Sequence, residues 1–246
     1  MNLPIQHHSL WKSILLHLLP GALITLLYFI SGPFLIKAGF PVLMPILLAI
    51  LVVLVPFELG YLFIQGKKQN GQFSLNNIVL NREPIPVWQY FVFVPLLICW
   101  CGLFFVTLGP LDSYLIQHFF SWLPTWSIVS QSAEILAQYP SSVLWTTVIA
   151  GFVLNGFAGP IVEELYFRGY LLPRIPVSTT WAPLINVLLF SLYHFFSPWQ
   201  NITRILALIP MVYVVSRKKN IYLGIITHCS VNIIGMLPLL ALLASH

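Results

Sequence analysis

The chain has 246 residues, of which 59% are hydrophobic and only 7% are charged. An ordinary soluble domain is about half apolar and about a quarter charged. A chain with this small number of charges cannot cover a surface that faces water. The composition therefore excludes a soluble domain and predicts a lipid bilayer as the main environment. The net charge of +5 is no evidence for nucleic-acid binding, because the basic residues lie mostly in the connectors between long apolar stretches.

These apolar stretches predict an all-α, polytopic membrane helix bundle. A spanning helix needs about 20 mostly apolar residues, and continuous apolar runs exclude the alternating pattern of a membrane β-barrel. We expect about seven crossings, within a range of roughly six to eight, and the fifth and sixth blocks are short. The blocks are 14–36, 42–64, 87–108, 143–162, 181–196, 205–215 and 221–243.

The distribution of basic residues predicts the orientation. If seven helices alternate, only Lys37 and Arg204 fall on one side of the membrane. Because cytoplasmic connectors carry an excess of Lys and Arg, we expect the N-terminus in the cytoplasm and the C-terminus outside. The residues on the other, cytoplasmic side are Lys12, Lys67, Lys68, Arg82, Arg174, Arg217, Lys218 and Lys219.

No connector is large enough to fold alone, so we expect a single membrane domain over 1–246. The segment 111–140 mixes aromatic and polar residues, a composition that favours the membrane–water interface, and predicts an interfacial helix or a short re-entrant piece. No internal repeat supports a transporter built from inverted repeats. The three cysteines show no metal-like spacing and no disulfide framework.

Ionisable residues within the apolar blocks are costly and indicate function. Glu163 and Glu164 are adjacent, and Arg168 lies four residues after Glu164, so Glu164 and Arg168 share a helix face and can form an ion pair. Glu163 points elsewhere and has no such partner. Pro160 suits a first helical turn, so we expect a helix to start near this point. The Glu164–Arg168 pair also fits a purely structural role.

Two histidines and an asparagine are candidates to meet Glu163 inside the bundle. His194 lies in the fifth block, and His228 and Asn232 share a face of the last block. A buried carboxylate can activate water as a general base, and His and Asn side chains can donate to the oxyanion of a tetrahedral intermediate. Each polar residue taken alone also fits a helix–helix hydrogen bond.

The remaining polar residues have simpler interpretations. Glu58 either faces an interface or pairs internally, and Asp112 lies in a predicted loop. Five other histidines are expected to be interfacial or solvated, namely His7, His8, His17, His118 and His246.

Together, Glu163-Glu164-Leu-Tyr-Phe-Arg168, Phe190-Ser-Leu-Tyr-His194 and His228-Cys-Ser-Val-Asn232 form an ordered triple of motifs. This pattern resembles the CAAX-protease and bacteriocin-processing family of intramembrane endopeptidases, also called abortive-infection-like. The matching region is 151–235, about a third of the chain, and we treat it as the expected catalytic core.

The resemblance implies a helical membrane fold with a polar conical cavity open toward the cytoplasm. It implies that Glu163 and His194 activate the hydrolytic water and that His228 and Asn232 form the oxyanion site, with Glu164 and Arg168 in support. We expect no cofactor. A zinc ion on His194, His228 and Glu163 is chemically conceivable, but widely spaced ligands on three helices are no metal signature.

The leading hypothesis is therefore a peptide-bond hydrolase of a bacterial plasma membrane, acting on a peptide or a membrane-protein substrate. The alternatives are a non-proteolytic immunity or scaffold protein with the same fold, and a proton or ion translocator, since Glu and His clusters also relay protons.

One feature conflicts with strictly alternating helices of full length. His194 would fall near the outer end of its helix, whereas Glu163 lies toward the inner end of its own. Because the fifth and sixth blocks are short, we expect them to stop at mid-depth or to tilt, so that residues 195–201 dip inward around Pro198.

Overall fold

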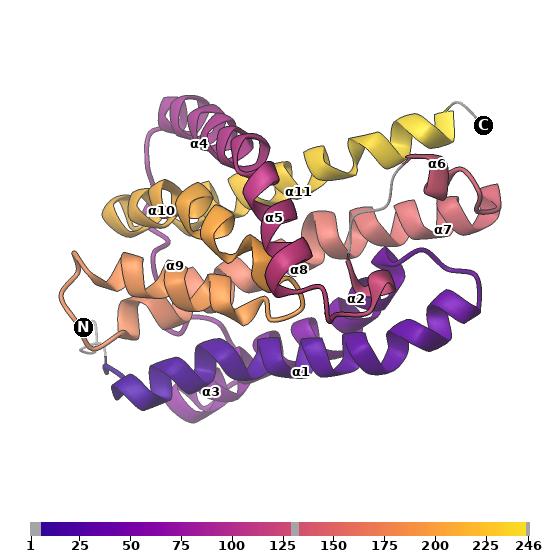
Figure 1. Cartoon of the computed structure of the whole chain (residues 1–246). Helices are drawn as coiled ribbons and strands as arrows, with labels where there is room; N and C mark the ends of the chain where they lie inside the picture. Colours follow the sequence, from indigo (N-terminus) through magenta and orange to yellow (C-terminus); the bar gives the residue numbers. More distant parts are fainter. Residues whose placement is uncertain (1–5, 129–132, 245–246) are drawn as a thin grey trace.

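The computed structural model describes residues 6–128 and 133–244, and helices joined by turns and loops make up this part of the chain. The predicted all-α membrane bundle is confirmed (Figure 1). Within the described residues, five helical segments are long and apolar enough to cross a membrane. They are Leu10–Lys37, Leu43–Asn70, Val87–Thr107, Ser141–Arg174 and Ile221–Ala241.

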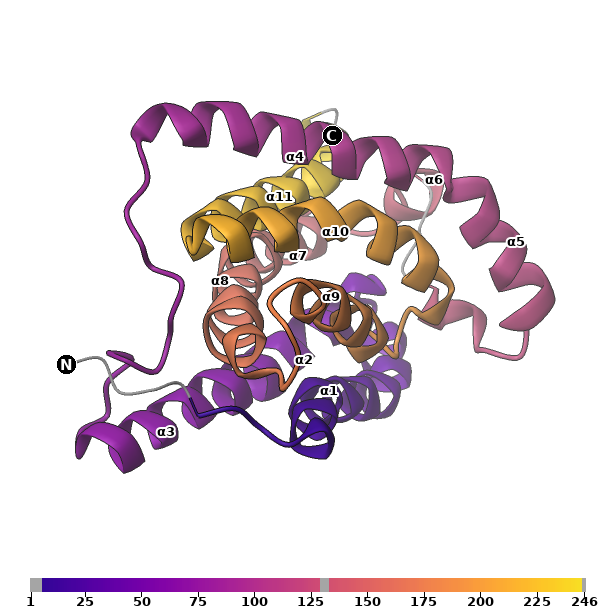
Figure 2. The ribbon, with the colours of Figure 1, turned by 90° about the vertical axis from the view of Figure 1, so that its left-hand side faces the viewer.

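These segments correspond to five of the seven predicted blocks. The first is α1 (Leu10–Lys37), and the third and last are α4 (Val87–Thr107) and α11 (Ile221–Ala244). The second is one continuous rod that combines α2 (Leu43–Ala49), a wider π-helical stretch η1 (Ile50–Leu59) and α3 (Gly60–Asn70). α4 crosses over α10 and α11 (Figure 2).

The two short predicted blocks form α9 (Ala182–Tyr193) and α10 (Asn201–Lys218), which pack side by side as a hairpin (Figures 1 and 2). α9 has 12 residues, so at 1.5 Å per residue it is only about 18 Å long and cannot cross a bilayer. After α9 the chain turns back through a short helix, η6 (Pro198–Gln200). The chain thus turns back before α9 is long enough to cross a bilayer, and the position of this turn at mid-depth stays a prediction.

Arg204 holds this turn together. Its guanidinium donates to Ser197 Oγ at 2.8 Å, to Gln200 Oε1 at 3.1 Å and to the Ser191 carbonyl at 3.3 Å. A buried turn has polar backbone that must be satisfied inside the protein. A cation from the returning helix therefore organises the loop that follows His194.

The segment 141–174 differs from the prediction of a helix start at Pro160, which is wrong. One continuous rod comprises α7 (Ser141–Ala150), the π-helical η3 (Gly151–Ala158), α8 (Gly159–Glu163), the π-helical η4 (Glu164–Leu171) and the 3₁₀ turn η5 (Leu172–Arg174). Gly159 N–H bonds the Leu154 carbonyl five residues back. This wider turn accommodates the proline, which would disturb a regular α-helix.

The predicted interfacial segment contains α5 (Gly109–Phe119), the 3₁₀ turn η2 (Thr125–Ser127) and α6 (Ala133–Leu136), while residues 129–132 lie outside the described part. Asp112 was expected in a loop that needs no explanation, and this expectation is wrong. Its side chain is buried and accepts a 2.6 Å hydrogen bond from Thr203 Oγ1, so α5 is tied to α10.

The N-terminal segment and two connectors meet at one end of the bundle, which we call the basic end. His8 N–H bonds the Arg174 carbonyl at 2.9 Å, Leu80 N–H bonds the Gly169 carbonyl at 2.8 Å, and Ile221 N–H bonds the Asn81 carbonyl at 2.7 Å. The eight residues predicted on the N-terminal side lie on these segments or at the helix ends beside them. The C-terminus lies at the opposite end (Figure 1). The single domain over 1–246, with its catalytic core at 151–235, stays a prediction.

Candidate active site

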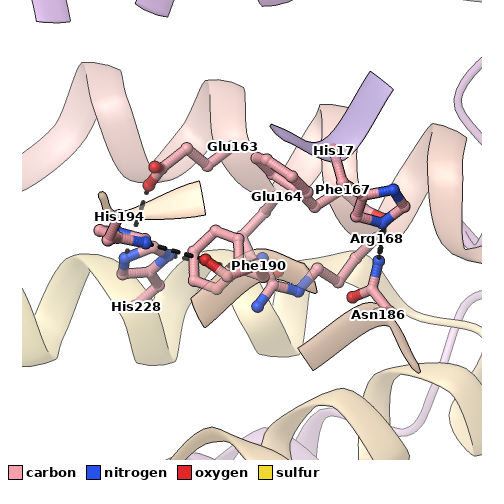
Figure 3. Close-up of polar contacts among 9 residues, drawn as sticks. All are labelled: His17, Glu163, Glu164, Phe167, Arg168, Asn186, Phe190, His194 and His228. Carbon is pink, nitrogen blue, oxygen red and sulfur yellow. Dashed lines mark hydrogen bonds and ion pairs between the residues drawn. The ribbon is translucent and has the colours of Figure 1, made fainter. Parts of the chain in front are cut away.

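Glu163 and Glu164 lie where α8 meets η4, and their side chains point to different surroundings (Figure 3). Glu164 is fully buried and forms an ion pair with Arg168, with 3.3 Å between Oε1 and the guanidinium. The same guanidinium lies 3.9 Å from the centre of the Phe190 ring. Glu163 instead lines a cavity. The predicted pair of Glu164 with Arg168 is therefore seen in the geometry, whereas Glu163 borders the cavity and faces His228.

His228 lies between the two glutamates. Its Nδ1 is 3.1 Å from Glu164 Oε1, and its Nε2 is 3.8 Å from Glu163 Oε2. Because carboxylates only accept, Nδ1 carries a proton toward Glu164. Gly224, one turn earlier on α11, makes this approach possible, since a Cβ there would collide with Glu164 Oε2.

His194 occupies the C-terminal end of α9 and faces the same cavity. Its Nδ1 lies 2.9 Å from the Phe190 carbonyl, which can only accept (Figure 3). The proton of a neutral imidazole is therefore on Nδ1, and Nε2 keeps a lone pair. The Phe-x-x-x-His motif thus fixes the ring through the backbone of its first residue.

Asn232 lies one turn after His228 on α11 and donates from Nδ2 to the Asn155 carbonyl at 2.9 Å. That carbonyl belongs to the π-helical stretch η3. An amide nitrogen carries two hydrogens, so one N–H remains for another acceptor. Asn232 and Asn155 both line the cavity.

The cavity has a volume of about 570 Å³ and contains all four predicted catalytic residues, Glu163, His194, His228 and Asn232, on its wall. Its size lies within the usual range for small-molecule and peptide side-chain pockets, about 300–1,000 Å³. Apolar side chains from several helices complete the wall, including Ile24, Ile46, Leu208 and Val231. The three motifs are thus brought together in one space.

Sequence reasoning did not identify the partners of three polar residues inside the bundle. Tyr193 donates to Glu58 Oε1 at 3.0 Å in the wall beside His194, so Glu58 is paired internally. His17 was expected to be interfacial or solvated, and this is wrong, because it is fully buried and its Nε2 lies 3.1 Å from Asn186 Nδ2. Arg204 was assigned to topology but lines the cavity. The one sequence feature that pointed to these contacts was the presence of polar residues within apolar blocks.

Among residues 6–128 and 133–244, no three His, Cys, Asp or Glu side chains are arranged to hold a metal ion. His228 faces both carboxylates, while His194 is turned to a backbone carbonyl. Independence from metal and cofactor stays a prediction.

The fold and this cavity define the class: an integral membrane protein of the helix-bundle type with a polar site inside the bundle. Residues 144–234 match the family described as Type II CAAX prenyl endopeptidase Rce1-like. That stretch contains all three motifs, so the resemblance predicted from their order is confirmed. This part of the chain is similar to the Rce1-like family of CAAX endopeptidases.

A curated relative is the UPF0177 protein YxdF of Lactococcus lactis subsp. lactis (strain IL1403), which is 31% identical over 103 residues. The alignment covers 42% of this chain and 54% of the relative, so the chain matches about half the length of that protein. No solved structure matches the chain.

Proposed function

We propose that this protein is an intramembrane endopeptidase that hydrolyses a peptide bond with a water molecule activated by Glu163 and His194. One observation carries the proposal. The Glu163 carboxylate and an imidazole nitrogen with a free lone pair line one cavity, and the chain around them matches an endopeptidase family.

In this mechanism a water molecule between Glu163 and His194 attacks the carbonyl carbon of the scissile bond. Glu163 takes the proton that the water loses. The second hydrogen of the water stays on its oxygen and forms a hydrogen bond to His194 Nε2, which orients the lone pair of the water oxygen toward the carbonyl carbon. The carbon–nitrogen bond then breaks, and the proton held by Glu163 passes to the leaving amine. Water supplies both the new carboxyl oxygen and the amine proton.

The negative oxygen of the tetrahedral intermediate needs donors that are already in place. Asn232 has one N–H beyond the bond to Asn155, and His228 Nε2 can donate when the ring carries two protons. Glu164 and Arg168 support this arrangement without contact with the substrate.

The match to an Rce1-like family supports a peptide or membrane-protein substrate, and the Lactococcus relative supports a bacterial plasma membrane as the location. A non-proteolytic immunity or scaffold role, or ion translocation, would leave the cavity without hydrolysis. These alternatives are outcomes of the experiment below.

The proposal is tested by terminal-peptide proteomics on membranes from cells that express either the native chain or Glu163→Gln. We expect new peptide termini that depend on Glu163. A matched control is Glu83→Gln, which changes an exposed glutamate at the basic end and should leave those termini intact. Identical termini in all three strains, at equal protein abundance, would contradict proteolysis. A chelator should not remove the termini, whereas loss with zinc rescue would replace the metal-free mechanism.

A further inference from the structure

The cavity has a closed floor and an open mouth, and the two lie toward opposite ends of the bundle. On the rod 43–70, Leu43 at the start is partly exposed, while Leu54 farther along is only 4% exposed. On the rod 141–174, Asn155 is partly exposed and Glu163 is 6% exposed. Both rods run toward the basic end, so burial of the cavity wall increases in that direction.

Two further helices of the wall, α10 and α11, give the same result. α11 runs away from the basic end, and along it Thr227 is 1% exposed whereas Asn232 is partly exposed. The helix α10 runs back toward the basic end. Gln200, just before its start, is partly exposed, whereas Met211, farther along α10, is fully buried. Four segments with alternating directions thus agree on where the cavity is closed.

A block of large side chains separates the cavity from the basic end. Tyr166, Phe167, Arg168, Tyr170 and Leu171 follow Glu163 on the same rod and are between 0 and 4% exposed. At the other side the wall includes the exposed Ser113 of α5 and the partly exposed Ile116 and Ile128. We call these three residues, with Leu43 and Asn155, the mouth.

The mouth therefore lies toward the end that carries almost no positive charge. Of the 11 Lys and Arg residues, eight lie at the basic end and Arg168 and Arg204 are buried inside the bundle. The remaining one, Lys37, is the last residue of α1, which starts at the basic end. An excess of Lys and Arg in short connectors marks the cytoplasmic side. The bias is large and comes from four separate segments of the chain.

Two expectations drawn from the sequence thus exclude each other. The basic residues place the N-terminus in the cytoplasm, and the resemblance implied a cavity open toward the cytoplasm. In this structure the N-terminal segment and the mouth belong to opposite ends, so only one expectation can hold. We keep the orientation predicted by the basic residues, because it rests on the charge distribution of this chain itself.

From the charge distribution and the direction of the cavity, we propose that the mouth opens on the non-cytoplasmic side. On this basis the substrate is a peptide segment that reaches the outer face, such as a secreted peptide or the outer part of a membrane protein. Apolar wall residues near the mouth, including Ile24, Ile46, Ile116 and Ile128, suit an apolar, extended segment that enters from the lipid boundary. The substrate class rests on the proposed function, whereas the orientation does not.

The test is cysteine labelling of the full chain in intact bacterial cells with a small, membrane-impermeant thiol reagent. Gln72→Cys reports on the basic end, Ser121→Cys reports on the exposed loop after α5, and Asn155→Cys reports on the cavity. The background removes the native thiols through Cys99→Ser, Cys101→Ser and Cys229→Ala.

We expect Ser121→Cys and Asn155→Cys to be labelled in intact cells, and Gln72→Cys to be labelled only after the cells are permeabilised. The reverse pattern would overturn the proposal, and so would labelling of Ser121→Cys and Gln72→Cys alike, because the chain would then insert in both directions. Labelling of Asn155→Cys only after permeabilisation, with Ser121→Cys reactive outside, would also overturn it. Labelling needs no cleavage, so its result is separate from that of the Glu163→Gln comparison.

Discussion

The two halves of the bundle bury polar residues in opposite ways. In the half next to the basic end, which we call the sealed half, Glu164 pairs with Arg168, His17 pairs with Asn186, and aromatic rings fill the space between them. In the half next to the mouth, Glu163 and His194 face a cavity of about 570 Å³. Adjacent residues of one helix, Glu163 and Glu164, therefore belong to different environments.

This difference separates stability from chemistry. A buried charge with a fixed partner is costly to unpair, so the residues of the sealed half are held in one arrangement. A buried carboxylate that faces water-sized space is free to accept a proton from a reacting group. His228 touches both halves, since Nδ1 faces Glu164 and Nε2 faces Glu163. The sealed half thus positions the ring that the open half uses.

The largest expected effect on stability comes from Glu164→Ala. It leaves Arg168 without its carboxylate inside the bundle, and loss of one partner of a buried ion pair costs about 3–5 kcal/mol. We expect a lower melting temperature and lower abundance in the membrane, measured by thermal unfolding in detergent. Glu83→Ala breaks an exposed pair with Lys219 and should change neither. Equal stability of the two variants would show that the sealed half is not held by its ion pair.

A smaller effect is expected from Gly224→Ala, which adds a methyl group where α11 approaches Glu164. Overpacking of this kind costs about 1–3 kcal/mol. Gly235→Ala is the matched control on the same helix, since nothing lies within 4 Å of its added Cβ, and Ala is favoured over Gly in a helix by about 1 kcal/mol. The two substitutions should shift the melting temperature in opposite directions. A shared direction would contradict the close contact.

The smallest effect concerns the N-terminal segment. Burial, with the nearby Lys12 and Arg174, lowers the pKa of His8 from 6.5 to about 4. When the N-terminal segment detaches from the bundle, His8 binds a proton more readily. The packing of this segment against the bundle is therefore most stable above pH 6.5 and becomes less stable as the pH falls toward 4. Hydrogen exchange of the His8 amide, which bonds the Arg174 carbonyl, should show greater opening at low pH. His8→Phe should remove this dependence, and an unchanged dependence would refute the role of His8.

Much of the site could be predicted because its information is local. The apolar blocks predicted the helices. Four-residue spacings predicted the pairing of Glu164 with Arg168 and the shared helix face of His228 and Asn232. The contacts of Glu58 with Tyr193, and of His17 with Asn186, join residues 135 and 169 positions apart. No helical periodicity links such distant residues, so only the packed bundle reveals them.

The helix start expected at Pro160 failed for a related reason. Proline favours a first turn when local preference decides, but here the preceding π-helical stretch lets the helix continue through it. The meeting of Glu163 and His194 at one cavity was foreseen, because the fifth block is too short to cross a bilayer. The direction of the cavity was not, because it depends on how burial changes along several helices at once.

The most direct test of the central claim uses the purified protein in lipid vesicles and a peptide that spans a cut site found by terminal proteomics. Hydrolysis is followed in water enriched in heavy oxygen, for the native chain, Glu163→Gln and Glu83→Gln. We predict that the native chain and Glu83→Gln place one heavy oxygen in the new carboxyl terminus, and that Glu163→Gln loses about 10²–10⁴-fold in rate, as expected for a general base. Hydrolysis by Glu163→Gln at the native rate would contradict the claim.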